Sequence, residues 1–233
     1  MDNDSDFVSY LYLSKEKFSI YIFNVLNMES LYEKEIIIKN LHNELDFEKI
    51  KDFLDENIIK SEKTLKYFIK NIFVILDTEN FFPIFISVKK DNGGNFLNLE
   101  NLSYLLNDAK LQCKKTMEEK EIIHMLVENY QIDSKDYPFL PKELKCNYFS
   151  LDVKFICLSK MFIKNLEKCL SRYQISIDQI ISANYLRDHF KDNHDLCRKA
   201  WQITEGCNPN EIKFYDKSYK NKGFFEKFFN FFR

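Results

Sequence analysis

Short runs of apolar residues alternate with longer amphipathic stretches over the first 118 residues. Asp46 stands at a typical N-cap position, and apolar residues follow it at helical spacing. We therefore predict two helices, over 46–69 and 98–113. Runs rich in β-branched and aromatic residues predict strands over 7–13, 18–26, 33–41, 71–76 and 81–88. Strands followed by long helices indicate an α/β layer, which we assign to residues 1–118.

A second unit is predicted over residues 119–186. Its pattern indicates a small β-β-α-β module, with strands over 120–132, 147–158 and 176–186 and a helix over 159–173. Residues 187–205 should then form a short helical segment. Residues 206–222 are polar and rich in lysine, and they are predicted to be a linker. The fold class predicted from these patterns is mixed α/β.

The segment 223–233 places six phenylalanines on what would be one face of a helix. Its charged and polar residues fall on the other face, as in amphipathic helices that lie in the plane of a membrane. An anionic lipid surface is the favoured partner, and docking on the protein's own core or on a second chain is the alternative. The predicted membrane-binding residues are Phe224, Phe225, Phe228, Phe229, Phe231, Phe232, Lys222, Lys227 and Arg233.

Composition and charge remove several classes of function. The 34 Lys and Arg residues are balanced by 36 Asp and Glu residues, so the chain lacks the concentrated basic face of a nucleic-acid-binding protein. The six cysteines include no CxxC pair, and we predict no metal site. The N-terminus lacks the pattern of a signal peptide, and the longest aliphatic and aromatic run, 72–76, is far shorter than the roughly 20 residues of a membrane span. We expect a cytoplasmic protein.

The second unit carries a recognisable set of residues. The strand over 120–132 contains a histidine and leads into a Tyr-x-x-Asp sequence, and a later helix with Asn and Cys precedes an Ile-Asp pair. This arrangement resembles the inserted subdomain, called 1C or SHS2, of FtsA, the actin-like cell-division protein family. The residues that carry the resemblance are His124, Tyr130, Asp133, Asn165, Cys169, Ile177 and Asp178. Val127, Glu143 and Cys146 stand where the family has a proline and two loop glycines.

The first unit resembles FtsA subdomain 1A more loosely. In that family the first strand runs into an Asp-x-Gly-Ser/Thr-x-Lys loop, whose backbone amides bind the phosphates of ATP. In the corresponding stretch here, Tyr12 replaces the Asp, Ser14 the Gly and Lys15 the Ser/Thr, while Lys17 is kept. We find no counterpart of subdomains 2A and 2B, which hold the second phosphate loop. The resemblance therefore implies half of an actin-like ATPase fold with an inserted 1C-type subdomain and a C-terminal amphipathic helix, and we predict no ATP, no other cofactor and no enzymatic activity.

The resemblance implies a nucleotide-free adaptor or scaffold, attached to the membrane, in bacterial cell division. Its partners would be anionic inner-membrane lipid and other division proteins, with FtsZ or late division proteins as candidates. Direct binding of FtsZ stays open, because that site lies in subdomain 2B in the family. The 1C-like module would support self-association, and the protein would lie at the cytoplasmic face of the membrane at midcell.

Two alternative functions remain. The first is an interaction subunit of a pilus or secretion platform, because the pilus-assembly PilM family has the same actin-like layout. The second is a residual enzyme that still binds ATP.

Overall fold

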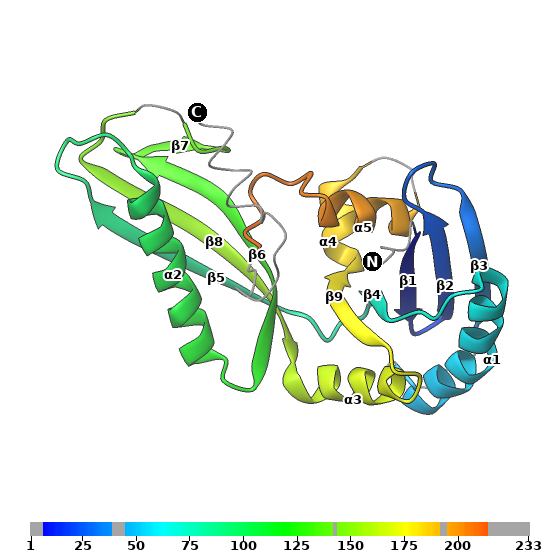
Figure 1. Ribbon diagram of the computed structural model, residues 1–233. Coiled ribbons are helices and arrows are strands. Elements are labelled where there is room, and N and C mark those ends of the chain that lie inside the picture. The colour runs from blue at the N-terminus through cyan, green and yellow to red at the C-terminus, as the bar shows by residue number, and fades with distance from the viewer. Residues whose placement is uncertain (1–6, 39–44, 142–143, 192–194, 214–233) are drawn as a thin grey trace. The chain divides into compact units, whose positions relative to one another are not determined.

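The computed structural model describes residues 7–38, 45–141, 144–191 and 195–213, which belong to two compact units (Figure 1). Unit 1 consists of Met1–Phe81 and Ser159–Ile203, and unit 2 of Phe82–Leu158 and Thr204–Arg233. Each unit has its own sheet. The mixed α/β class expected from the sequence is confirmed.

Unit 1 is built on a five-stranded sheet with the order β3-β2-β1-β4-β9. The first three strands form an antiparallel meander, whereas β4 runs parallel to both β1 and β9. The carboxyl ends of β1, β4 and β9 therefore lie at one edge of the sheet. The strands are β1 (Phe7–Ser14), β2 (Lys17–Asn24), β3 (Ser30–Ile37), β4 (Asn71–Asp77) and β9 (Ser176–Ser182).

Four helices belong to unit 1 within the described residues, and the longest is α1 (Phe47–Leu65). Asp46 caps α1 as predicted, because its carboxylate accepts hydrogen bonds from the backbone N–H groups of Glu48 and Lys49. The buried face of α1 packs on the sheet, where the rings of Phe53 and Phe18 meet edge to face at 6.0 Å. The other helices are α3 (Lys160–Ser171), α4 (Ala183–His189) and α5 (Leu196–Thr204).

Unit 2 is a four-stranded sheet with the order β5-β8-β6-β7, and α2 (Leu99–Thr116) packs on it. Alternate residues of the strands point toward α2 and form the core with its apolar stripe. Asn98 caps the helix through the N–H of Asn101. The strands are β5 (Phe82–Asp91), β6 (Lys120–Ile132), β7 (Lys135–Tyr137) and β8 (Tyr148–Ser159).

The division into units differs from the expected boundaries of 1–118 and 119–186. The strand β5 pairs along its whole length with β8, and α2 packs on that sheet, so residues 82–118 belong with the second sheet. The strand β9 pairs with β4, so the last strand of the expected β-β-α-β module belongs to unit 1 instead. These pairings join segments far apart in the chain, and sequence periodicity carries no information about them.

Two smaller expectations also change. The strand predicted over 176–186 ends at Ser182, because the Ser182 hydroxyl accepts a hydrogen bond from the N–H of Tyr185 and begins α4. The linker predicted over 206–222 begins as part of unit 2. There, Val127 N–H donates to the Asn210 carbonyl (2.9 Å) and Ile212 N–H to the Met125 carbonyl (2.8 Å), which extends the edge of β6.

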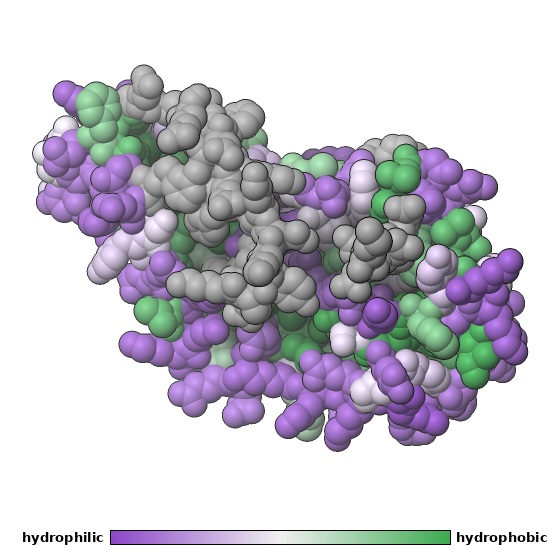
Figure 2. All heavy atoms as spheres, in the orientation of Figure 1, coloured by the Kyte–Doolittle hydropathy of each residue, from purple (hydrophilic) through white to green (hydrophobic). Residues whose placement is uncertain are grey.

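The predicted amphipathic helix, 223–233, lies outside the described residues, as does the rest of the linker. In the part of the chain that the structure describes, no helix is both long enough and apolar enough to cross a bilayer. Figure 2 shows a face on which hydrophilic residues predominate and hydrophobic ones appear in small groups.

Candidate functional site

A cavity of about 470 Å³ opens in unit 1 where the carboxyl ends of the parallel strands meet. This edge of a parallel sheet is where ligands bind in many α/β proteins, because loops and helix starts gather there. The cavity contains all four residues predicted for the degenerate phosphate loop, Tyr12, Ser14, Lys15 and Lys17. It is also lined by Glu16, Asp77, Glu79, Asn184 and Arg187, among others.

The turn between β1 and β2 is closed by its own side chain. The Ser14 hydroxyl accepts hydrogen bonds from the N–H groups of Lys17 (2.9 Å) and Glu16 (3.2 Å), and it lies 3.1 Å from the Lys17 carbonyl oxygen, to which it can donate. A phosphate loop needs such backbone N–H groups directed at the ligand. Here the N–H groups of Glu16 and Lys17 already donate to the Ser14 hydroxyl oxygen, so these two amides are not free to bind a phosphate.

Asp77 is the centre of a hydrogen-bonded cluster at the end of β4. The Tyr12 hydroxyl donates to its Oδ2 atom at 2.7 Å, and Arg187 Nη1 donates to its Oδ1 atom at 2.9 Å. Arg187 Nη2 makes a second bond to the same carboxylate, and Nη1 also contacts Asn184 Oδ1 at 3.1 Å. The guanidinium and carboxylate thus form a bidentate pair, the stronger form of this interaction.

The titration of these groups follows from their contacts. The Arg187 guanidinium holds the pKa of Asp77 below its usual value of 3.8, and the Tyr12 hydroxyl acts in the same direction. Burial, together with the hydrogen bond to Asp77, raises the pKa of Tyr12 to about 12. At neutral pH Asp77 is therefore ionised and Tyr12 is a neutral donor to it. The cluster holds an ionised pair with satisfied hydrogen bonds, and neither group is poised near pH 7 as a general acid or base.

Lys17, the residue kept from the phosphate-loop pattern, has a different partner. Its Nζ atom forms an ion pair with Glu35 of β3 at 2.9 Å and lies 5.4 Å from the centre of the Tyr12 ring. The sequence pattern identified Lys17 but missed Asp77 and Arg187. Asp77 could have been suspected, since it directly follows a buried strand. Nothing in the local sequence around Arg187 indicates its partner.

Two of the residues that carry the 1C resemblance, His124 and Asp133, have structural contacts within unit 2. His124 is buried, and its Nδ1 atom lies 2.7 Å from the Glu211 carboxylate. Asp133 accepts hydrogen bonds from the N–H groups of Asn147 and Tyr148, both at 2.9 Å, and thereby fixes the start of β8. The described residues contain no cluster of His, Cys, Asp or Glu that could hold a metal ion. The predicted membrane-binding residues, Lys222 to Arg233, lie outside the described part.

No protein-family model matches the chain, and the search of curated proteins returned no match. Several solved structures are similar to it. One is the cytoplasmic domain of EpsL, an inner membrane component of the type II secretion system of Vibrio cholerae, with 12% identity and a TM-score of 0.37. The second is the PilM–PilN type IV pilus biogenesis complex, with 6% identity and a TM-score of 0.45. The third is a Bacteroides thetaiotaomicron protein with an actin-like ATPase fold and unknown function, with 18% identity and a TM-score of 0.36.

These similarities cover 77%, 78% and 80% of this chain, respectively. The chain spans only 57%, 49% and 56% of the three solved chains. The mixed α/β fold class follows from the sheets and helices of this chain itself and does not depend on these similarities.

We predict that replacing Arg187 with Gln raises the pKa of Asp77, because the guanidinium is the largest cause of its depression. Since the pKa of Asp77 is lowered in the folded protein, its contribution to stability is complete above the unfolded value near 3.8 and is lost as pH falls through the lower, folded value. Carboxyl ¹³C NMR titration of wild type and Arg187→Gln measures the shift. Arg198→Gln, which removes the exposed pair with Asp195, should leave the pKa of Asp77 unchanged. An identical Asp77 titration in Arg187→Gln would contradict the assignment.

Proposed function

We propose that this protein is a non-enzymatic adaptor of a membrane-associated assembly and that it neither binds nor hydrolyses ATP. The observation that carries the proposal is that polar groups in the cavity at the carboxyl ends of β1, β4 and β9 already have partners within the protein. The turn amides of the cavity are bound by Ser14, and its arginine is paired with Asp77. A fold with the layout of a nucleotide-binding domain, but with polar groups of this site already bound within the protein, is suited to present surfaces to partners.

Electrostatics supports the absence of a phosphate ligand. Three cations line the cavity, Lys15, Lys17 and Arg187, and two of them are paired, Arg187 with Asp77 and Lys17 with Glu35. Glu16 and Glu79 line the same cavity. A triphosphate placed there would meet these carboxylates and would compete with Asp77 for Arg187, and both effects oppose binding.

The assembly is one of the two expected from the sequence. The resemblance of residues 119–186 to FtsA favours cell division, with FtsZ or late division proteins as partners and a midcell location. The EpsL domain and the PilM–PilN complex named above belong to secretion and pilus machinery. We therefore place the pilus or secretion platform first among the assemblies to test. Co-purification with inner-membrane components of such a platform would favour it, and a midcell band of a fluorescent fusion would favour division.

Self-association of unit 2 is part of the proposal, and the strand β5 is its best-supported route. Within unit 2, β5 is an edge strand that pairs with β8 on one side. It carries no charged residue from Phe82 to Val88, whereas the edge strand β3 of unit 1 has Glu33, Lys34 and Glu35 at its centre. Charged residues on an edge hinder pairing with another chain, and their lack on β5 favours it.

The hydrogen-bond pattern tells which groups of β5 are available. Asn92 N–H donates to the Asn147 carbonyl at 2.7 Å, and the register of β5 with β8 is unbroken, so the even-numbered residues bond to β8. The N–H groups of Phe85, Ser87 and Lys89 therefore point away from β8. Pro83 also has this outward orientation, so it removes no bond from the ladder. An antiparallel pair of β5 strands centred on Ser87 would use the three outward N–H groups of each copy.

We predict that the protein shows no ATP binding by isothermal titration calorimetry, with or without Mg²⁺. The reason is that the turn amides and Arg187 already have partners. An affinity in the micromolar range would overturn the nucleotide-free proposal and revive the residual enzyme.

We predict that removing residues 223–233 lowers binding to anionic liposomes at least tenfold, because six phenylalanines and the flanking cations are lost together. Co-sedimentation with phosphatidylglycerol vesicles measures the change. Deletion of residues 2–6, which include three aspartates and no apolar residue, is the control and should not lower binding. Undiminished binding of the shortened protein would show that this segment is not the anchor.

We predict that Ser87→Pro weakens self-association at least tenfold and leaves the fold intact, since it removes an outward N–H and no backbone hydrogen bond to β8. It also removes the bond from the Ser87 hydroxyl to Asp152 of β8, a loss that Ser87→Ala reproduces while keeping the outward N–H. Sedimentation velocity gives the association constant, and circular dichroism reports the fold. Ile86→Pro is the contrasting variant, because it removes a bond to β8 and should lower the melting temperature. A monomeric wild type, or self-association that is unaffected in Ser87→Pro, would exclude β5 as the interface.

A further inference from the structure

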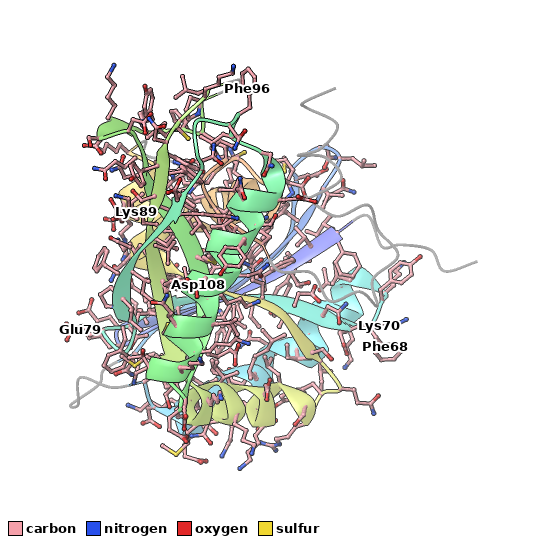
Figure 3. The ribbon with its side chains drawn as sticks, turned by 90° about the vertical axis from the view of Figure 1, so that its left-hand side faces the viewer. Phe68, Lys70, Glu79, Lys89, Phe96 and Asp108 are labelled. Carbon is pink, nitrogen blue, oxygen red and sulfur yellow. The ribbon has the colours of Figure 1, made fainter. Side chains whose placement is uncertain are left out.

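The loop 66–70, which joins α1 to β4, presents an aromatic ring to solvent. The side chain of Phe68 is 81% exposed, the largest value among the large apolar side chains that the structure describes. The neighbouring Tyr67 is also exposed, and its ring lies 6.5 Å from that of Phe7. Phe68 and Lys70 are labelled in Figure 3, where they lie at the margin of the ribbon in that view. A single exposed ring is common on protein surfaces, so the structure of the loop and the charges beside the ring decide whether it can serve as a contact.

The loop is fixed on both sides of Phe68, so the ring cannot fold inward without breaking contacts. Lys66 adopts a left-handed conformation with φ of 59° and ends α1. The next anchor is Ile69, which is buried and whose N–H donates to the Glu62 carboxylate at 3.0 Å. The Lys70 carbonyl then accepts a bond from Ser176 N–H of β9 at 2.9 Å. The exposure of Phe68 is therefore built into the loop.

The charged residues that stand nearest to Phe68 along the chain are mainly lysines. Lys63, Lys66 and Lys70 are all exposed and lie within five positions of the ring along the chain. The nearest acid in the sequence, Glu62, is bound to the Ile69 amide. An aromatic ring flanked by exposed lysines fits the boundary between lipid headgroups and acyl chains, where rings settle and lysines meet anionic headgroups.

A second apolar tip lies at the same edge of the unit 1 sheet. The pairings of Phe7 with Asn24 and of Tyr10 with Phe73 place the turn between β2 and β3 at the edge where β4 begins. Leu26 in that turn is 79% exposed, and Asn24 Oδ1 fixes its backbone by accepting from its N–H at 2.8 Å. The strands β2 and β4 are two strand spacings apart, or about 10 Å. This edge is opposite to the carboxyl edge that holds the cavity.

We infer that this edge of unit 1, with Phe68, Tyr67, Leu26 and the three lysines, is a contact surface for an anionic lipid bilayer. The inference rests on the membrane attachment in the proposed function and adds a second contact to the predicted helix 223–233. Two separate contacts suit stable attachment, because a single short apolar group binds a membrane only reversibly. The Phe68 ring is flanked by exposed lysines, an arrangement that fits an anionic lipid surface better than the shaped groove of a protein partner.

A tryptophan reporter tests the inference in the full chain. Trp201 is the only tryptophan, so Trp201→Phe gives a silent background into which Phe68→Trp is introduced. With vesicles of equal parts phosphatidylglycerol and phosphatidylethanolamine, the emission should shift to the blue and be quenched by brominated lipid. The matched control is Ile37→Trp in the same background. Ile37 is 80% exposed and lies at the opposite edge of the same sheet, so its emission should not change.

A second measurement does not depend on the reporter. The variant Phe68→Ser with Lys66→Glu and Lys70→Glu should reduce co-sedimentation with the same vesicles about tenfold, through loss of the ring and reversal of two charges. Vesicles of phosphatidylcholine alone should bind wild type and variant equally weakly. If the protein co-sediments while Phe68→Trp stays unquenched, or if Ile37→Trp is quenched equally, the inference that this surface contacts lipid is wrong. Attachment through residues 223–233 is then unaffected. If wild type does not co-sediment at all, both the surface and the membrane attachment fail.

Discussion

The parallel pairing of β4 with β1 on one side and β9 on the other determines the arrangement of unit 1. It brings the ends of three strands to one edge, and there Tyr12, Asp77 and Arg187 meet. The same pairing places the beginnings of these strands, and the loop that carries Phe68, at the other edge. The cavity and the Phe68 loop, on which the functional proposals rest, thus lie at opposite ends of one set of parallel strands.

The polar groups of the cluster around Asp77 bond to one another. Parallel sheets leave a polar depression at their carboxyl edge, and a buried polar group there needs a partner. In this protein the Ser14 hydroxyl bonds to the turn amides, and Arg187 and Tyr12 bond to the strand-end carboxylate. The depression remains as a cavity, but its strongest donors and acceptors are already satisfied. The proposed lack of nucleotide binding is compatible with retention of the sheet for this reason.

The candidate site could be predicted only in part. A comparison with the phosphate-loop pattern singled out Tyr12, Ser14, Lys15 and Lys17, which follow one another closely in the sequence, and all four line one cavity. The loss of the glycine was also readable, since Ser14 has a side chain where the pattern needs none. The hydrogen bonds that the Ser14 hydroxyl accepts from the turn amides could not be predicted from the sequence, because they depend on the backbone geometry of the hairpin.

The sequence by itself determined the local elements. Asp46 and the spacing behind it define α1, and apolar runs define β4, β6 and β8, because capping and periodicity are properties of neighbouring residues. Only the tertiary structure decided which strands share a sheet, and it moved β5 and α2 into unit 2 and β9 into unit 1. It also decided the pair between Asp77 and Arg187, which are separated by 110 positions in the chain. Contacts of that separation form through the packing of whole elements, and no local pattern in the sequence encodes them.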